Sequence, residues 1–176
     1  MDRAVNRIAK AIKNDEKVYI YGDYDIDGIS ASALLYDAFT QMGLNASLYI
    51  PDRFEEGYGL NSKALKKLKD DGASLVISVD CGTTAHKQAD YSKKIGLDLI
   101  ITDHHEPDGG APKGALACIN PKLQKDSKLR ELAGVGVAFY LVRALQNELK
   151  VLKPGQEKWL LDLVALGTIC DVVPLT

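Results

Sequence analysis

YIYGDYDIDGISASALLY, residues 19–36, joins the end of an apolar run to the start of a helical pattern. KVYIYG (17–22) is rich in β-branched and aromatic residues and ends at a glycine, which predicts a strand. ISASALLYDAFTQMG (29–43) has helical periodicity and ends at a glycine that favours helix termination. Between the two lie three carboxylates at alternate positions, on Asp23, Asp25 and Asp27. Like charges this close repel each other, so the chain must gain something by holding them together.

The alternation of strand and helix continues along the rest of the chain. Apolar runs predict further strands at 46–51, 74–80, 97–103 and 115–120. Helical patterns predict helices at 2–13, at 61–70, in the polar stretch that ends at Lys94, at 131–149 and at 156–170. Unbroken apolar strands that alternate with helices are typical of a parallel sheet covered on both faces. We therefore expect an α/β fold: a parallel β-sheet of about five strands, with helices on both faces and further C-terminal helices.

Composition narrows the functional classes. The chain has 176 residues, 46% of them hydrophobic and 26% charged, as in an ordinary globular protein, and we expect one domain over 1–176. No apolar run reaches the length of a membrane span, so no membrane partner is expected. Three cysteines without CxxC spacing predict neither a disulfide framework nor a zinc knuckle, and favour a cytoplasmic protein. With a net charge of −2, a nucleic acid would have to be held by local basic groups or by metal ions.

Acidic and imidazole side chains follow three of the predicted strands. Besides the aspartates at 23–27, Asp80 ends the third strand, and Asp103, His104 and His105 end the fourth. The carboxyl ends of parallel strands form one edge of a sheet, where ligands bind. A single aspartate there is as readily a helix cap, but caps need one carboxylate per helix. This set has no adjacent lysine or arginine to neutralise it. A divalent ion is the simplest counter-charge, and mixed Asp and His ligands suit Mn²⁺ or Mg²⁺.

The same segments resemble a known family. GDYDIDGIS (22–30), SVDCGTT (78–84) and ITDHHEP (101–107) are similar to successive motifs of the DHH phosphoesterases, named after Asp-His-His. Other segments resemble the RecJ-type single-strand-specific exonucleases within that family: PDRFEEGYGLN (51–61), INPK (119–122), LAGVGVAFYLVRAL (132–145) and ALGTICDVVPL (165–175). The resemblance covers almost the whole chain.

The resemblance implies a site with two manganese ions, Mg²⁺ being the alternative. It assigns one ion to Asp27, Asp80, His104 and Asp171, and the other to Asp23 and Asp25 with Asp80 as the bridge. The argument from the carboxyl ends of the strands does not identify Asp171, which is assigned only by the resemblance.

The catalytic residues implied are His105, facing the phosphate, Asp103, supporting the histidine pair, and Arg53, a bidentate phosphate ligand. The alternative for Arg53 is a surface ion pair with Glu55 or Glu56.

Four further residues keep two interpretations each. Asn61 either contacts phosphate or caps the following helix. Gly134 and Gly136 either let backbone N–H groups approach a phosphate or allow close helix packing. Tyr58 either stacks on a base or packs in the core or its loop, and packing is the expected role.

The function that the resemblance implies is a metal-dependent exonuclease that hydrolyses single-stranded DNA from its 5′ end, in DNA repair and recombination. Its partners would be single-stranded DNA and repair or replication proteins. One alternative is a DHH phosphodiesterase for short oligonucleotides or cyclic dinucleotides. Another is a catalytically silent DHH scaffold of the replication machinery. RecJ-type proteins carry a second domain, DHHA1, and often an OB-fold, so the 176 residues resemble the catalytic lobe alone.

Overall fold

A five-stranded parallel sheet forms the centre of the computed structural model, which describes residues 1–175. In chain order the strands are β1 (Val18–Gly22), β2 (Ala46–Tyr49), β3 (Leu75–Val79), β4 (Asp98–Thr102) and β5 (Ala117–Ile119). They pair in the order β2-β1-β3-β4-β5, and every pair is parallel. The order reverses next to β1, and the crevice at such a reversal is the usual ligand site of an open α/β sheet. The expected parallel sheet is confirmed.

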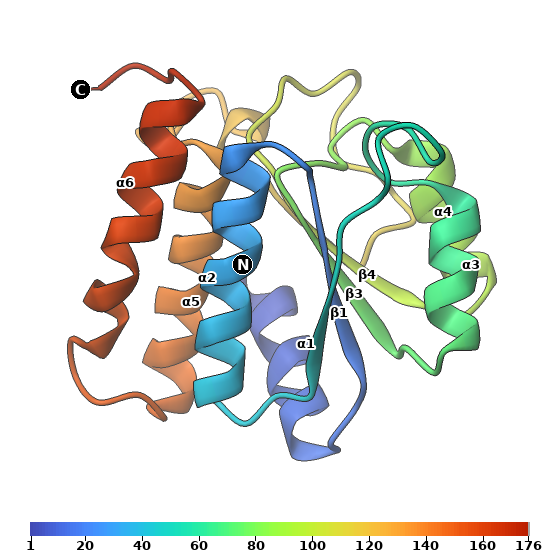
Figure 1. Cartoon of the computed structure of the whole chain (residues 1–176), viewed down its shortest axis with the longest axis horizontal. Coiled ribbons are helices and arrows are strands. Elements are labelled where there is room, and N and C mark those ends of the chain that lie inside the picture. Colours follow the sequence, from blue (N-terminus) through green and yellow to red (C-terminus); the bar gives the residue numbers. More distant parts are fainter. Residues whose placement is uncertain (176) are drawn as a thin grey trace.

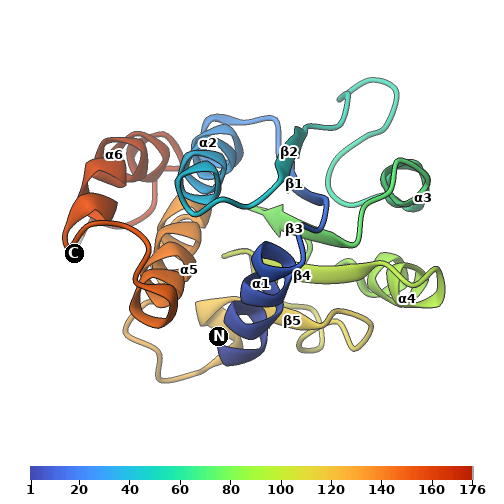
Figure 2. The same cartoon turned by 90° about the horizontal axis from the view of Figure 1, so that it is seen from below.

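Helices cover both faces of this sheet. They are α1 (Asp2–Lys13), α2 (Ile26–Gln41), α3 (Ser62–Asp70), α4 (His86–Lys94), α5 (Gly134–Leu149) and α6 (Leu161–Cys170). Figure 1 shows α3 and α4 on one side of the strands and α1, α2 and α5 on the other. Seen from below in Figure 2, α6 lies outside α2 and α5, as a further layer.

Two apolar cores result because successive strand side chains point to opposite faces. Ile20 and Ile77 pack with α1, α2 and α5, whereas Tyr21 and Val76 pack with α3 and α4. All four side chains are fully buried, and each stabilises the fold by roughly 1.5–3 kcal/mol. The central strands β1 and β3 are thereby fixed from both sides, which holds the side chains at their carboxyl ends in place.

The boundaries of three helices differ from those expected. The helix predicted at 29–43 begins at Ile26, because the side chain of Asp25 caps it. The helix predicted at 131–149 begins at Gly134, after extended backbone at Ala133. The segment predicted as one helix at 156–170 is a 3₁₀ turn (Gln156–Leu160) followed by α6, and a second 3₁₀ turn spans Pro121–Leu123. Within residues 1–175 no helix has both the length and the apolar character needed to span a membrane.

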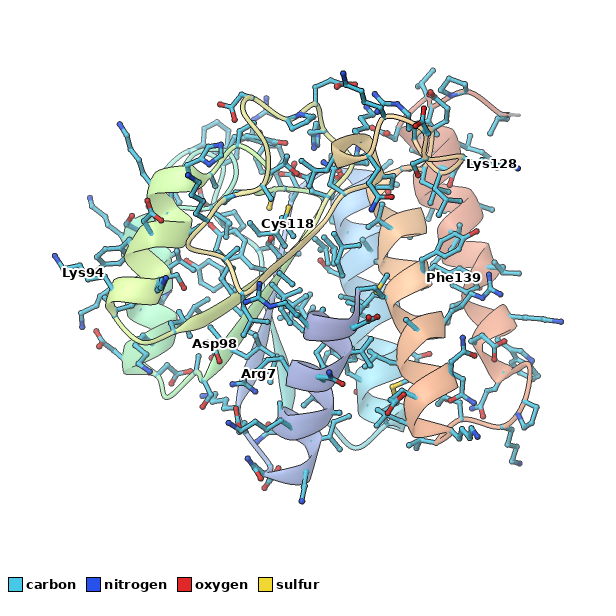
Figure 3. All side chains as sticks on the ribbon, turned by 180° about the vertical axis from the view of Figure 1, so that it is seen from behind. Arg7, Lys94, Asp98, Cys118, Lys128 and Phe139 are labelled. Carbon is cyan, nitrogen blue, oxygen red and sulfur yellow. The ribbon has the colours of Figure 1, made fainter. Side chains whose placement is uncertain are left out.

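A half-buried arginine fixes the opposite edge of the sheet. Arg7 on α1 donates through Nε to Asp98 Oδ2 and through Nη2 to Glu16 Oε2, both at 2.6 Å. Figure 3 shows Arg7 beside Asp98, where β4 begins. The amino ends of the strands are thus held by a structural ion-pair network, and the residues singled out in the sequence lie at the carboxyl ends.

Candidate metal centre

His104 faces three carboxylates that come from three other segments. Its Nε2 lies 3.2 Å from Asp80 Oδ1, 3.5 Å from Asp171 Oδ2 and 3.8 Å from Asp27 Oδ2. His104 follows β4, Asp80 follows β3, Asp27 lies in the first turn of α2, and Asp171 is the C-cap of α6. Adjacent ligands of an octahedral ion with bonds of about 2.1 Å lie about 3 Å apart. The distances between the four groups are slightly longer than those between the ligands of a bound ion, so the groups would bind an ion after a small inward movement.

A second set of carboxylates shares Asp80 with the first. Asp23, Asp25 and Asp80 each offer an oxygen within 4.8 Å of the others. Asp23 and Asp80 are buried, whereas Asp25 is exposed and accepts a hydrogen bond from Gly28 N at 2.8 Å as the N-cap of α2. The cap that sequence reasoning left open thus belongs to Asp25. Asp80 lies between the two sets, as a bridging ligand would.

The backbone at Asp80 is held in an unfavourable conformation. Its φ of 59° lies in the left-handed region, which costs energy for a residue other than glycine. Its amide donates to the carbonyl of Thr102 at 2.9 Å, which fixes the turn after β3. Gly134 makes room for the carboxylate, since a Cβ there would lie 2.5 Å from Asp80 Oδ1. The local strain points to a functional position for Asp80.

Asp27 accepts backbone hydrogen bonds at the N-terminus of α5. Gly134 N donates to its Oδ2 at 2.5 Å and Val135 N to its Oδ1 at 2.9 Å. The first N–H groups of a helix have no partner within the helix, and they favour a negative charge. Gly167 on α6 allows the close approach, because a Cβ there would meet Asp27 Oδ1 at 2.7 Å. Asp27 thus links α2, α5 and α6 at the site.

No lysine or arginine forms an ion pair with the buried carboxylates in the described part of the chain. Burial raises the pKa of Asp23 and of Asp27. For Asp80, burial and the neighbouring Asp27 and Asp25 raise the pKa to about 10. Asp80 Oδ1 and His104 Nε2 are buried without a hydrogen-bond partner among residues 1–175. The donor atoms of the site are carboxylate oxygens and one imidazole nitrogen, and two of these atoms have no hydrogen-bond partner. Such a set fits a hard divalent cation such as Mn²⁺ or Mg²⁺.

Asp103 holds the adjacent histidine rather than joining the clusters. Its Oδ1 accepts hydrogen bonds from His104 N at 2.7 Å and from His105 Nδ1 at 2.8 Å, and its Oδ2 accepts one from Thr83 N at 2.8 Å. Burial alone would raise the pKa of Asp103, but the bonds from His105 and Thr83 outweigh it and lower the pKa to about 2. In turn, the hydrogen bond to Asp103 raises the pKa of His105. His105 Nε2 lies 3.5 Å from the hydroxyl of Tyr58.

Sequence reasoning missed two residues that support this histidine. Asn120 Nδ2 donates to the carbonyl of His105 and to Thr83 Oγ1, both at 2.8 Å. Asn120 is buried, and Thr83 has no exposed surface. Asn120 directly follows β5 at the same sheet edge as the aspartates, and that position is the signal that could have found it.

Arg53 and Asn61 lie on the loop between β2 and α3. Arg53 is exposed, and its Cζ lies 5.1 Å from the ring centroid of Tyr24. Within residues 1–175 no ion pair forms between Arg53 and Glu55 or Glu56. Asn61 caps α3 by accepting from Ala64 N at 2.7 Å, so the capping role is confirmed. Contact of either residue with phosphate stays a prediction.

Gly134 and Gly136 are both buried at the start of α5. The N–H of Gly134 is already donated to Asp27, and a Cβ at Gly136 would lie 3.1 Å from the side chain of Leu132. These contacts favour close packing, one of the two interpretations that the sequence left open, over a role in phosphate binding.

Residues 17–168 match the family described as "DHH family, N-terminal domain". The chain belongs to the DHH family. Asp103, His104 and His105 are the Asp-His-His triplet in this DHH chain.

Several relatives of this DHH chain carry the name RecJ. It is 46% identical over 176 residues to the "Single-stranded-DNA-specific exonuclease RecJ" of Bacillus subtilis, covering 99% of this chain and 21% of that protein. The solved structure of an "exonuclease RecJ bound to manganese" matches 98% of this chain with a TM-score of 0.86 and 34% identity, over 43% of its own length. RecJ from Thermus thermophilus in complex with Mn²⁺ matches 98% of this chain with a TM-score of 0.81 and 31% identity, over 24% of its length. The DHH chain thus spans less than half of each of these relatives.

Proposed function

We propose that this chain is the catalytic lobe, residues 1–176, of a RecJ-type exonuclease that hydrolyses phosphodiester bonds of single-stranded DNA. One observation carries the proposal: two sets of candidate ligands share the buried Asp80 at the carboxyl edge of the sheet. A carboxylate that reaches two ions is typical of sites that clamp both oxygens of a displacement at phosphorus. The names of the relatives, single-stranded-DNA-specific exonucleases, support the choice of substrate.

The proposed ligand sets follow the distances. Asp27, Asp80, His104 and Asp171 would hold one Mn²⁺, and Asp23 and Asp25 would hold the second with Asp80 as the bridge. Mg²⁺ suits the same donors. When bound, the ions supply Lewis-acid activation of water and of the phosphoryl oxygens. Solved relatives that contain Mn²⁺ support this choice of metal.

His105 orients and stabilises the reacting phosphate in this proposal. The ionised Asp103 carboxylate only accepts hydrogen bonds, so Nδ1 of His105 carries the proton directed at it. This contact fixes the orientation of the ring, and the raised pKa of His105 favours the doubly protonated imidazolium. Nε2–H then donates to a non-bridging phosphate oxygen, where negative charge develops.

Arg53 would bind the same phosphate. Its guanidinium has no carboxylate partner within residues 1–175, and the ring of Tyr24 supports it from one face. A guanidinium placed in this way can make two parallel hydrogen bonds to a phosphate.

Polarity and cellular context belong to the same proposal. Digestion from the 5′ end, a role in DNA repair and recombination, and contact with repair or replication proteins follow from the resemblance to RecJ-type exonucleases. A cytoplasmic location follows from the three cysteines without CxxC spacing. Asn61 remains a candidate substrate contact, whereas the packing of Gly134 and Gly136 disfavours that role for both glycines.

End-labelled single strands test the proposal. With Mn²⁺, the protein should release labelled mononucleotides from a 5′-labelled oligonucleotide and leave a ladder of shortened products from a 3′-labelled one. Asp80→Asn should abolish both. The matched control Asp90→Asn, at an exposed carboxylate on α4, should abolish neither. Full activity of Asp80→Asn would contradict the proposed metal centre.

A series of substrates separates the two alternatives. Preference for a cyclic dinucleotide over a single strand would favour the small-molecule phosphodiesterase. Binding of Mn²⁺ without hydrolysis of any phosphodiester would favour the silent scaffold.

A further inference from the structure

Four residues beside the metal centre form a closed circuit of hydrogen bonds, here called the histidine circuit. His105 Nδ1 donates to Asp103 Oδ1 at 2.8 Å, and Asp103 Oδ2 accepts from Thr83 N at 2.8 Å. Thr83 Oγ1 in turn accepts from Asn120 Nδ2 at 2.8 Å. The same Asn120 amide donates to the carbonyl of His105, also at 2.8 Å, which closes the circuit. His105 is therefore held twice, by its ring and by its backbone.

The histidine circuit joins the turns that follow three neighbouring strands. Thr83 lies after β3, Asp103 and His105 after β4, and Asn120 after β5. Thr83, Asp103 and Asn120 are buried, where hydrogen bonds are electrostatically stronger than in water. The His105 side chain is 46% exposed. The circuit is thus a buried base that carries one accessible imidazole.

Tyr58 does not fix this imidazole from the solvent side. Its hydroxyl lies 3.5 Å from His105 Nε2, which is a weak hydrogen bond at best. Tyr58 is also 58% exposed, so the packing role expected for it is wrong. The orientation of His105 therefore depends on the buried side of the circuit.

The side chain of Asn120 is held in one orientation. Both of its N–H donors are used in the circuit, and its Oδ1 accepts from Lys122 N at 2.8 Å. The pairing of β4 with β5 does not need this side chain, because Asp103 N already donates to the carbonyl of Ile119 at 3.0 Å. The contacts of the Asn120 amide thus serve the turn that carries His105 rather than the sheet.

We propose that Asn120 is a positioning residue, which holds His105 against the reacting phosphate through Thr83 and the carbonyl of His105. The inference rests on the proposed function and deepens it, because it names a residue that controls the rate without touching the substrate. A displacement of about 1 Å in a reacting group costs about a hundredfold in rate. Since His105 is proposed to act where charge develops, its displacement lowers kcat and leaves KM nearly unchanged.

Two substitutions open the histidine circuit at successive links. Asn120→Ala should lower kcat by about 10- to 100-fold and keep KM close to that of wild type. Thr83→Val removes the hydroxyl, keeps the amide that binds Asp103, and should lower kcat in the same way. The double variant should be no slower than the slower single variant, because both changes open one circuit.

Ser92→Ala is the matched control for the loss of a buried hydrogen bond. Ser92 Oγ donates to the carbonyl of Leu97 at 2.6 Å, just before β4 begins and so at the opposite edge of the sheet. This variant should lower Tm and keep the kcat of wild type. If Asn120→Ala lowers kcat no more than Ser92→Ala does, or raises only KM, the positioning role is refuted.

Proton NMR of the metal-free protein separates this inference from the proposed function. The chain has three histidines, so the Nδ1–H signal of His105 is assigned by its absence in His105→Gln. The bond to Asp103 should keep this signal sharp in wild type and in Ser92→Ala. Asn120→Ala should broaden it, and so should Thr83→Val, which serves if Asn120→Ala does not fold.

The two measurements fail independently. If wild type hydrolyses no single strand, the proposed function fails, whereas broadening of the signal in Asn120→Ala still supports the positioning of His105. An equally sharp signal in Asn120→Ala and wild type, or no signal in wild type, overturns the inference.

Discussion

Replacing Asp80 by asparagine should stabilise the metal-free protein while removing its response to metal. The side chain is 1% exposed and has neighbouring carboxylates, and its pKa is raised to about 10. The unfolded chain ionises this group near pH 3.9. At pH 7 the folded state must keep a proton that the unfolded state loses, at a cost of as much as about 4 kcal/mol. Asparagine is neutral, has the same shape and tolerates the positive φ of this position.

The sign of the pH dependence follows from the raised pKa. A group with a higher pKa in the folded state contributes stability that is present below the unfolded pKa and lost as the pH rises. The advantage of Asp80→Asn over wild type should therefore be about 1–2 kcal/mol at pH 5 and approach about 4 kcal/mol at pH 7.

Urea unfolding in EDTA at the two pH values measures this difference. The exposed Asp90→Asn serves as the control and should match wild type at both. Adding Mn²⁺ should stabilise wild type and Asp90→Asn but not Asp80→Asn. If metal-free Asp80→Asn is less stable than wild type at pH 7, the reasoning that Asp80 is a strained ligand without a counter-charge is refuted.

Four more predictions follow from the same site. Gly134→Ala would place a Cβ 2.5 Å from Asp80 Oδ1, so it should lower the free energy of unfolding by about 1–3 kcal/mol and abolish stabilisation by Mn²⁺. The control Gly136→Ala, whose Cβ would lie 3.1 Å from the Leu132 side chain, should keep the stabilisation by Mn²⁺. Denaturation with and without Mn²⁺ compares the two variants. Free Mn²⁺ at a hundred times its Kd should stabilise wild type by about 2.7 kcal/mol, reversibly with EDTA, and a melting curve indifferent to both would contradict metal binding. Arg53→Ala should lower kcat/KM at least about tenfold, the loss of one hydrogen-bonded charge pair, with no change in Tm because the side chain is exposed; an unchanged rate excludes Arg53 as a phosphate ligand. A substrate-length series should show slow, distributive cleavage with no advantage for long strands, since a net charge of −2 gives the chain no overall attraction for a polyanion, and processive digestion would contradict this.

Sequence patterns identified the sheet because each strand carries its own signal. The apolar runs that end at Gly22, Val79 and Thr102 are local features, and the parallel rule then places their following residues at one edge. This reasoning found the segments of Asp23, Asp80 and His104 without a structure.

Residues that reach the site through tertiary packing have no such signal. Asp171 ends α6, which is apolar all round and packs outside the other layers, so its sequence does not show where its C-terminus points. Only the family resemblance supplied it. Gly134 was noted as a glycine before a helix, but its contact with Asp80, 54 residues earlier, depends on the docking of α5. The exposure of Tyr58 likewise depends on a loop whose path local patterns do not define.

Diffraction from crystals soaked in Mn²⁺, with anomalous data collected at the manganese edge, tests the central claim most directly. The account predicts two peaks about 3.5–4 Å apart. One should be bonded to Asp27, Asp80, His104 and Asp171, and the other to Asp23 and Asp25, with Asp80 reaching both. A single peak, or two peaks of which only one contacts Asp80, would contradict it.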